Sequence, residues 1–164
     1  MLNEIERKFI INNLPKLNLE NKLIYKRYFI YSNEGVEIRI QQKGNQFELE
    51  RKEKVTNLVS KKDKIIISNG EFEFFKSIVI KEIIRDGYII YENDVKIDLK
   101  VYHGNFEGLI RAEVEFATEE EAQNFLIPKW FDKEITDSPL GRDSKLVDLS
   151  INEFNKILGN LFDS

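Results

Sequence analysis

The sequence predicts a β-rich α+β domain built on antiparallel strands. Charged and apolar residues alternate in five segments, which places the charges on one face of each strand. These segments are residues 4–9, 37–41, 47–54, 96–101 and 111–116, although Arg51 and Glu53 interrupt the apolar face of the third. Both signs of charge occur along the same faces, and this leaves two interpretations open. One is an antiparallel sheet with a solvated face, and the other is a closed barrel whose interior holds a charged ligand.

The expected strands follow the chain closely, with short turns between them. They cover residues 2–11, 23–32, 35–43, 46–55, 59–68, 79–85, 88–92, 94–102 and 107–116. Glycine, asparagine and aspartate favour tight turns at residues 33–35, 43–45, 86–87 and 103–105. If the strands close into a barrel with a polar interior, the hydrophobic core lies outside it. The candidates for that core are Ile5, Phe9, Ile38, Ile40, Leu49, Ile97, Leu99, Val114 and Phe116.

Capping residues predict three helices. Ser68 precedes a short apolar pattern over residues 71–76. Thr118 with Glu121 forms a capping-box pattern that opens a helix to about residue 126. Ser150 with Glu153 opens a third helix. Its apolar face consists of Ile151, Phe154, Ile157, Leu158 and Leu161.

Composition restricts the class of protein. The 164 residues fit one domain spanning 1–164, and the formal net charge of −4 argues against general nucleic-acid binding. There is no cysteine, hence no disulfide, no thiolate metal site and no thiol nucleophile. No signal peptide and no membrane-length apolar run are recognised, so a cytoplasmic protein without a membrane partner is expected. The oligomeric state is open, a homodimer included.

Three blocks of sequence resemble one known family. Residues 4–8, EIERK, resemble the ExExK signature of the CYTH superfamily, the triphosphate tunnel metalloenzymes. The Phe9 that follows is similar to its bacterial tripolyphosphatase-like branch. Residues 102–116 resemble the family's "HG…GL…AEVE" hairpin, and residues 128–137 its Pro-Trp segment before "EVT-D". The blocks occur in the family's order and cover nearly the whole chain.

The resemblance implies a closed tunnel of about eight antiparallel strands with a charged interior and helices outside. It implies hydrolysis of a triphosphate with Mg²⁺ or Mn²⁺, with inorganic triphosphate as the leading substrate and a nucleoside or thiamine triphosphate as alternatives. Two other activities stay open. The domain binds phosphorylated polyanions without turnover, or it cyclises ATP as adenylate cyclases do.

The resemblance also assigns roles to individual residues. Acidic residues would hold the metal through hard oxygen ligands, and arginine and lysine would hold the phosphates. The implied metal ligands are Glu4, Glu6, Asp63, Glu113 and Glu115. The implied substrate-binding residues are Lys8, Arg39, Lys52, Lys61 and Arg85. Glu4, Glu6, Lys8 and Arg39 would be catalytic.

Four positions depart from the family pattern. Gln41 stands where a second basic residue is usual, and Ile65 where a second acid is usual. Ile83 replaces a lysine, and Lys100 an aspartate. The lost contacts bear on catalysis, because a charge-assisted contact to phosphate is worth roughly 2 kcal/mol.

Overall fold

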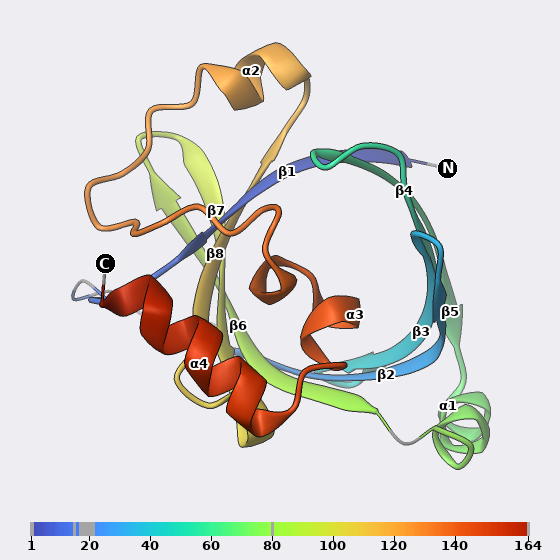
Figure 1. Cartoon of the computed structure of the whole chain (residues 1–164). Coiled ribbons are helices and arrows are strands. Elements are labelled where there is room, and N and C mark those ends of the chain that lie inside the picture. The colour runs from blue at the N-terminus through green and yellow to red at the C-terminus, as the bar shows by residue number, and fades with distance from the viewer. Residues whose placement is uncertain (1, 15, 17–21, 80, 164) are drawn as a thin grey trace.

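Eight antiparallel strands close into a barrel, which confirms the predicted fold class (Figure 1). The structure is a computed structural model that describes residues 2–14, 16, 22–79 and 81–163. Around the barrel the strands follow the order β1-β5-β4-β3-β2-β6-β7-β8, and β8 pairs again with β1. Their bounds are Leu2–Ile10 (β1), Leu23–Asn33 (β2), Val36–Lys43 (β3), Gln46–Lys54 (β4), Val59–Ile67 (β5), Glu82–Glu92 (β6), Val95–Tyr102 (β7) and Ile110–Phe116 (β8).

The predicted turn at residues 86–87 is wrong, because β6 runs through it as one strand. The actual turn comes at Asn93 and Asp94, whose φ angles are 50° and 65°. Gly87 allows close packing within the strand and does not form a turn. A Cβ there would lie 2.8 Å from Cε2 of Tyr25, so the glycine makes room for that ring. Residue 80, within the predicted strand 79–85, lies outside the described residues.

All three predicted helices form. Of the two predicted capping boxes, the one at Ser150 is complete, while at Thr118 only the bond from Glu121 N to the Thr118 hydroxyl forms. Ser68, predicted as a cap, also makes a full capping box. The two helices with a complete box are α1 (Asn69–Lys76), capped by Ser68 with Glu71, and α4 (Ile151–Phe162), capped by Ser150 with Glu153. Helix α2 (Glu119–Gln123) is shorter than predicted. In the described part of the chain, no helix has the length and apolar character needed to cross a membrane.

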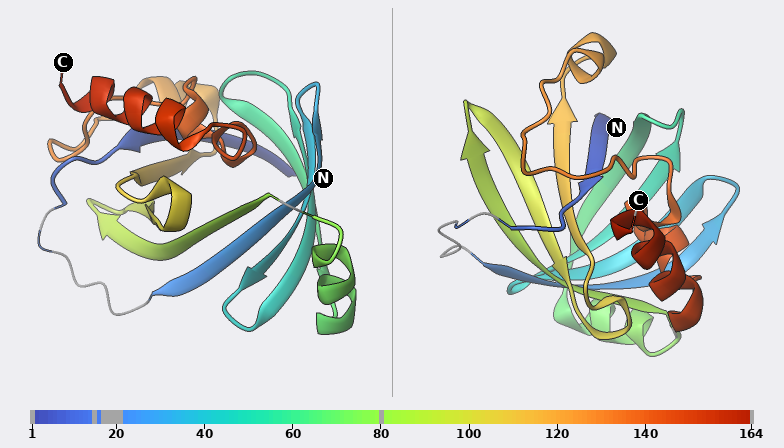
Figure 2. Two further views of the ribbon diagram at one scale, coloured as in Figure 1. Left: turned by 60° about the horizontal axis from the view of Figure 1, so that its bottom comes forward. Right: turned by 60° about the vertical axis from the view of Figure 1, so that its left-hand side comes forward.

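Two hydrophobic clusters cover the outside of the barrel, as predicted. Helix α1 packs Phe72 against Tyr28, Ile40 and Ile67. On another side, Phe131 and its neighbours cover the backs of β1, β7 and β8. The buried strand residues of this second cluster are Phe9, Ile97, Leu99, Ala112 and Val114. Figure 2 shows α1 and α4 on different sides of the barrel.

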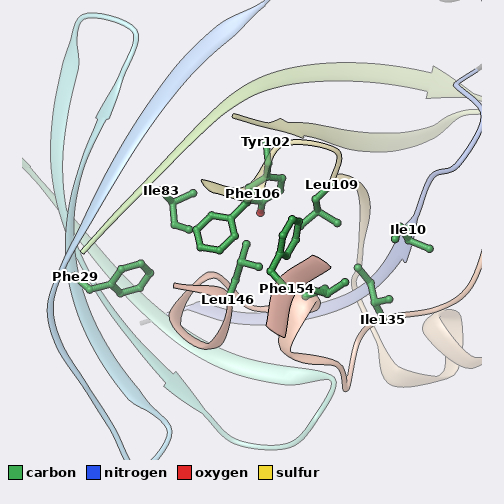
Figure 3. Packing of buried hydrophobic residues seen from close by; sticks show 10 residues of the cluster. Ile10, Phe29, Ile83, Tyr102, Phe106, Leu109, Ile135, Leu146 and Phe154 are labelled. Atoms are coloured by element: carbon green, nitrogen blue, oxygen red, sulfur yellow. The ribbon is translucent and has the colours of Figure 1, made fainter. Parts of the chain in front are cut away.

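A third cluster, which the sequence did not predict, fills one end of the barrel interior (Figure 3). Its barrel residues are Ile10, Phe29, Ile83, Tyr102 and Leu109. Residues 132–149, called here the plug, enter this end with Ile135, Leu140 and Leu146. The plug contains two short helices, η2 (Pro139–Gly141) and α3 (Asp143–Leu146), and Phe154 of α4 packs behind it. One end of the barrel is therefore closed by apolar packing.

Strand β1 holds the plug through its free edge. Strand β5 pairs only with residues 2–5 of β1, while β8 pairs with residues 5–10 on the other side. Beyond residue 5 the plug takes the place of β5, with hydrogen bonds from Ile10 N to Lys133 O (2.9 Å) and from Ile135 N to Lys8 O (2.8 Å). A small cavity of about 50 Å³ remains between the plug and the β4–β5 loop.

Candidate functional site

The barrel interior beyond the plug is lined by charged side chains from all eight strands. Strand alternation turns every second residue inward. The inward-facing polar residues are Glu4, Glu6, Lys8, Arg27, Glu37, Arg39, Gln41, Glu48, Glu50, Lys52, Lys62, Lys64, Arg85, Asp98, Lys100, Arg111, Glu113 and Glu115. They surround an open mouth of about 850 Å³ and a deeper chamber of about 70 Å³. The two spaces adjoin, since they share Glu4, Glu6, Arg27, Lys62, Lys100 and Glu113.

The deep chamber carries more positive than negative side chains. Its cations are Lys8, Arg27, Arg39, Lys52, Lys62, Lys100, Arg111 and Arg142. Its carboxylates are Glu4, Glu6, Glu37, Glu113 and Asp143. With every group in its ordinary charge state, eight cations against five anions leave an excess of three positive charges, although the whole chain is at −4. A chamber of this kind attracts compact anions.

Lysines hold the two carboxylates of β1. Lys52 Nζ lies 3.1 Å from Glu4 Oε2 and 3.1 Å from Glu6 Oε1, and Lys62 Nζ lies 2.5 Å from Glu4 Oε1. Burial alone would raise the pKa of Glu6, but Lys52 and Lys8 lower it to about 2. Glu6 is therefore ionised at neutral pH.

Glu113 is held by three cations. Arg111 Nη2 lies 2.8 Å and Lys8 Nζ 3.9 Å from its Oε1, and Lys100 contacts Oε2. These cations keep the pKa of Glu113 well below its ordinary value despite burial. Burial lowers the pKa of a lysine, because it disfavours the charged ammonium group. It lowers the pKa of Lys8 to about 8, and burial with Arg85 nearby lowers that of Lys100 to about 7.

The β3–β4 wall mixes arginine with carboxylates. Arg39 Nε donates to Glu50 Oε2 at 2.8 Å, and Nη1 contacts Glu37. Burial alone would lower the pKa of Arg39, but Glu50 and Glu37 raise it above its ordinary value. Gln41 joins the same network: its Oε1 accepts from Arg27 at 2.6 and 3.0 Å, and its Nε2 donates to Glu48 and Glu50.

The guanidinium of Arg85 is buried with hydrogen-bond donors that have no partner among the described residues. Its side chain is 1% exposed, and within the described residues neither Nε nor Nη1 has a hydrogen-bond partner. The guanidinium lies over the Tyr25 ring, 4.8 Å from its centroid, and Nε is 3.5 Å from Asp143 Oδ2. Because buried donors are costly to leave unpaired, this group is suited to an anion entering from the mouth.

The acidic residues have the chemistry of a divalent-metal site. Glu6 lies directly opposite Glu115 on the neighbouring strand, and the buried Glu4 Oε2 has no hydrogen bond from the described residues. Burial, then Glu4 and Glu6, raise the pKa of Glu115. A cation there would relieve this repulsion. As the side chains lie, however, no three acidic or histidine residues of the described chain enclose a metal position. Holding an ion would require the carboxylates to exchange lysine partners for it.

Comparisons with known proteins find one similar curated protein and several similar solved structures. No family model matches the chain. The inorganic triphosphatase of Nitrosomonas europaea is 28% identical over 138 residues, which are 83% of this chain and 91% of the relative. A solved structure of the inorganic triphosphatase NE1496 superposes with a TM-score of 0.68 at 25% identity, over 90% of this chain and 95% of that one. The chain is thus similar to an inorganic triphosphatase over most of its length, which is consistent with the CYTH resemblance of its sequence.

Two solved structures share the fold at lower identity. A Hippeastrum protein, described as a putative adenylyl cyclase with a dominant triphosphatase activity, has a TM-score of 0.52 at 13% identity, over 73% of this chain and 82% of that one. A putative adenylate cyclase from Bacillus halodurans has a TM-score of 0.58 at 12% identity, over 100% of this chain and 93% of that one. Proteins of more than one description thus share this fold.

Eight of the ten residues singled out from the sequence line the interior. Glu4, Glu6, Lys8, Arg39, Lys52 and Glu113 surround the deep chamber, and Arg85 and Glu115 line the mouth. Lys61 and Asp63 do not join them. They occupy the outward positions of β5, opposite Glu53 and Arg51 of β4, and the inward positions belong to Lys62 and Lys64. The expected inward face of β5 is thus one residue out of register.

The four departures from the family pattern fall in different surroundings. Gln41 is buried in the interior network, and Lys100 lines both the chamber and the mouth. Ile83 belongs to the apolar end beneath the plug. Ile65 lies on the outward face of β5, in line with Asp63.

Several interior residues were missed from the sequence. Glu37, Glu50 and Arg111 each lie two residues from a predicted site residue on the same strand, so the alternation already used for Arg39, Lys52 and Glu113 would have found them. Arg27 lies in a strand without alternation, and Asp143 begins the short helix α3 of the plug. Neither has a local sequence signal.

Proposed function

We propose that this protein hydrolyses inorganic triphosphate in the deep chamber with the help of Mg²⁺ or Mn²⁺. The observation that carries the proposal is the convergence of Glu4, Glu6, Lys8, Lys52 and Glu113 on one enclosed space with excess positive charge. A relative named inorganic triphosphatase, aligned over most of both chains, supports the substrate. The large mouth leaves room for substrates that carry a further group.

The basic residues would bind the phosphates from several strands at once. Lys8, Lys52, Lys62 and Lys100 present ammonium groups, while Arg39 and Arg85 offer planar guanidinium donors. Such donors are fixed before the substrate arrives, and they stabilise charge that develops on the phosphoryl oxygens during transfer. This fixed electrostatic environment is the main contribution of the chain to the reaction.

The reaction would be attack of a water molecule on a terminal phosphorus. A new P–O bond forms from the water oxygen, the anhydride P–O bond breaks, and orthophosphate and pyrophosphate leave. Glu4, Glu6, Glu113 and Glu115 would hold the divalent metal, which when bound neutralises phosphate charge. An ionised carboxylate such as Glu6 can also orient the water by accepting a hydrogen bond from it, and the proton of the water then passes to the leaving phosphate or to solvent.

One observation favours binding without turnover. Arg39 contacts both Glu37 and Glu50, and Gln41 occupies the inward position beside them, so part of the cationic wall is already neutralised. Binding of a phosphorylated polyanion without hydrolysis is therefore the competing function.

Phosphate release from inorganic triphosphate, measured with Mg²⁺ and separately with Mn²⁺, tests the proposal. The double variant Glu4→Gln/Glu6→Gln keeps the shape of the side chains and removes both charges. We expect it to lose about 100-fold or more of the activity. The matched control is Glu53→Gln on the outer face of β4, where Glu53 pairs with Arg51 at 3.2 Å.

The outcomes separate the two functions. Release that survives in Glu53→Gln and disappears in the double variant supports hydrolysis at this site. If the folded wild-type protein releases no phosphate with either metal but binds triphosphate in a calorimetric titration, it is a polyanion-binding protein and the proposal is wrong.

A further inference from the structure

Asp143, the first residue of α3, is a carboxylate on which three arginines of the barrel converge. Its Oδ2 accepts from Arg27 Nη1 at 2.9 Å, and Arg85 Nε lies 3.5 Å from the same oxygen. Its Oδ1 accepts from Arg111 Nη2 at 3.1 Å and from the Tyr102 hydroxyl at 2.6 Å. Four strands and the plug therefore meet at one side chain that is 3% exposed.

The charge of Asp143 is strongly favoured where it lies. Burial alone would raise its pKa, but Arg85, Arg111 and Arg27 keep the pKa well below its ordinary value. The same arginines repel one another, and burial with Arg39 and Arg85 nearby lowers the pKa of Arg27 to about 10. A single ionised carboxylate between them offsets this repulsion.

Asp143 also fixes where these arginines point. An arginine side chain has many rotamers, and fixing one costs conformational entropy. Arg111 is held at both ends of its guanidinium, because Nη1 donates to Leu140 O at 2.9 Å while Nη2 donates to Asp143. Arg85 is placed between the Tyr25 ring and Asp143, with Nε directed to the carboxylate and Nη1 without a partner among the described residues. Arg27 and Arg111 line the chamber directly.

We propose that Asp143 is a positioning residue that preorganises Arg27, Arg85 and Arg111 for the phosphate groups of the substrate. This inference rests on the proposed function for its catalytic consequence. The phosphate site is complete only when the plug has entered the barrel, because Asp143 comes from a segment far from these strands in the sequence. The plug that closes the barrel thus also supplies a residue of the phosphate site.

The variant Asp143→Asn separates the positioning of the arginines from the electrostatic attraction of the chamber for triphosphate. Asparagine has the same shape but no charge, so the chamber gains one net positive charge and attracts a bound triphosphate more strongly. The arginines lose the carboxylate that fixes them, and preorganised donors matter most in the transition state. We expect metal-free triphosphate to bind about threefold more tightly or better. With metal, kcat should fall about tenfold or more while KM does not rise.

The matched control is Asp148→Asn in the same plug. Asp148 is half-exposed and pairs with Lys81 on the surface, so this variant makes the same chemical change outside the site. Each protein is first checked for folding by thermal unfolding and then assayed below its transition. Triphosphate affinity is measured by calorimetry in the presence of a metal chelator. A purely structural role would reduce the folded fraction, and this cannot tighten binding.

Tighter binding and slower turnover in Asp143→Asn, with neither in Asp148→Asn, support the inference. Unchanged kcat, or weaker triphosphate binding by folded Asp143→Asn, overturns it.

If Asp143→Asn does not fold, the variant Tyr102→Phe tests the inference instead, because it removes one hydrogen-bond donor to Asp143 and leaves all charges in place. A kcat lowered about threefold at unchanged triphosphate affinity is then expected, and an unchanged kcat overturns the inference. Wild-type protein without any turnover would refute the proposed function, and the binding measurements on Asp143→Asn would still test Asp143.

Discussion

Lys62 on β5 holds Glu4 on β1, with Nζ 2.5 Å from Oε1. The pair joins two neighbouring strands of the barrel. Lys52 on β4 contacts the other carboxylate oxygen of Glu4. Lys52, which is expected to bind phosphate, and Glu4, which is expected to bind metal, therefore neutralise each other in the ligand-free interior, with Lys62 as a second partner of Glu4. This arrangement explains how so many charges are buried together, because unpaired buried charges are costly.

Lys62 and its neighbour Lys61 provide a test of which face of β5 serves the site. We expect Lys62→Met to weaken triphosphate binding about tenfold, because it removes a charged donor at the entrance to the chamber. Lys61→Met should change the affinity by less than about twofold, since that side chain is exposed on the outer face. Calorimetric titration measures both. Equal losses in the two variants would contradict the inward register of Lys62.

Metal and triphosphate should assist each other's binding. A metal that takes Glu4 and Glu6 releases Lys52 and Lys62 for phosphate, and a triphosphate that takes the lysines releases the carboxylates. We expect Mg²⁺ affinity, titrated by calorimetry, to rise about tenfold or more when a non-hydrolysable triphosphate analogue is present. The analogue's own affinity for Mg²⁺ is subtracted in a titration with Glu4→Gln/Glu6→Gln. An identical Mg²⁺ affinity with and without the analogue would rule out this coupling.

Triphosphate affinity should depend on pH through Lys100. Burial, then Arg85, lower the pKa of Lys100 to about 7, so its ammonium loses the proton as pH rises above that value. An anionic ligand favours the protonated form, so the affinity should fall as pH rises from 7 to 9. In Lys100→Met this dependence should be weaker and centred nearer 8, where the buried Lys8 titrates. The titration of the ligand itself cancels when the two proteins are compared. Parallel affinity profiles for both proteins would argue against a role for Lys100.

Two glycines should respond to alanine in opposite directions. At Gly141 in the plug, a Cβ would lie 2.0 Å from the carbonyl oxygen of Ile135, so the backbone must shift. We expect Gly141→Ala to lower the free energy of unfolding by about 3 kcal/mol and the melting temperature by about 5–10 °C. In α4, a Cβ at Gly159 meets no atom within 4 Å, and Gly159→Ala should stabilise the helix by about 0.5–1 kcal/mol. Thermal unfolding monitored by circular dichroism gives both values. A Gly141→Ala protein as stable as wild type would mean that the plug is not tightly packed against residue 135.

Strand and helix positions could be predicted well where the chain has strong local signals. The capping boxes at Ser68 and Ser150 start α1 and α4 at the predicted residues, because the caps act through hydrogen bonds three residues away. The failure at residues 86–87 has a tertiary cause. Asp-Gly is a good turn sequence, but here the glycine accommodates Tyr25 from the neighbouring strand.

Site residues, too, could be predicted where the sequence signal is local and could not where it is not. Glu4, Glu6 and Lys8 could be placed together because they alternate on one strand in a recognisable motif. Lys61 and Asp63 were placed on the wrong face because the run of residues 61–64 is charged throughout, and a strand of that composition does not reveal which side faces inward.

The sequence by itself determined the strands, the capped helices, the CYTH resemblance and the alternating charges, because each depends on residues a few positions apart. Only the tertiary structure decided that the barrel is closed at one end, that β5 presents Lys62, and that Asp143 gathers three arginines. These relationships join residues that are distant in the chain, and they form because buried charges must find partners and an apolar barrel end must be filled.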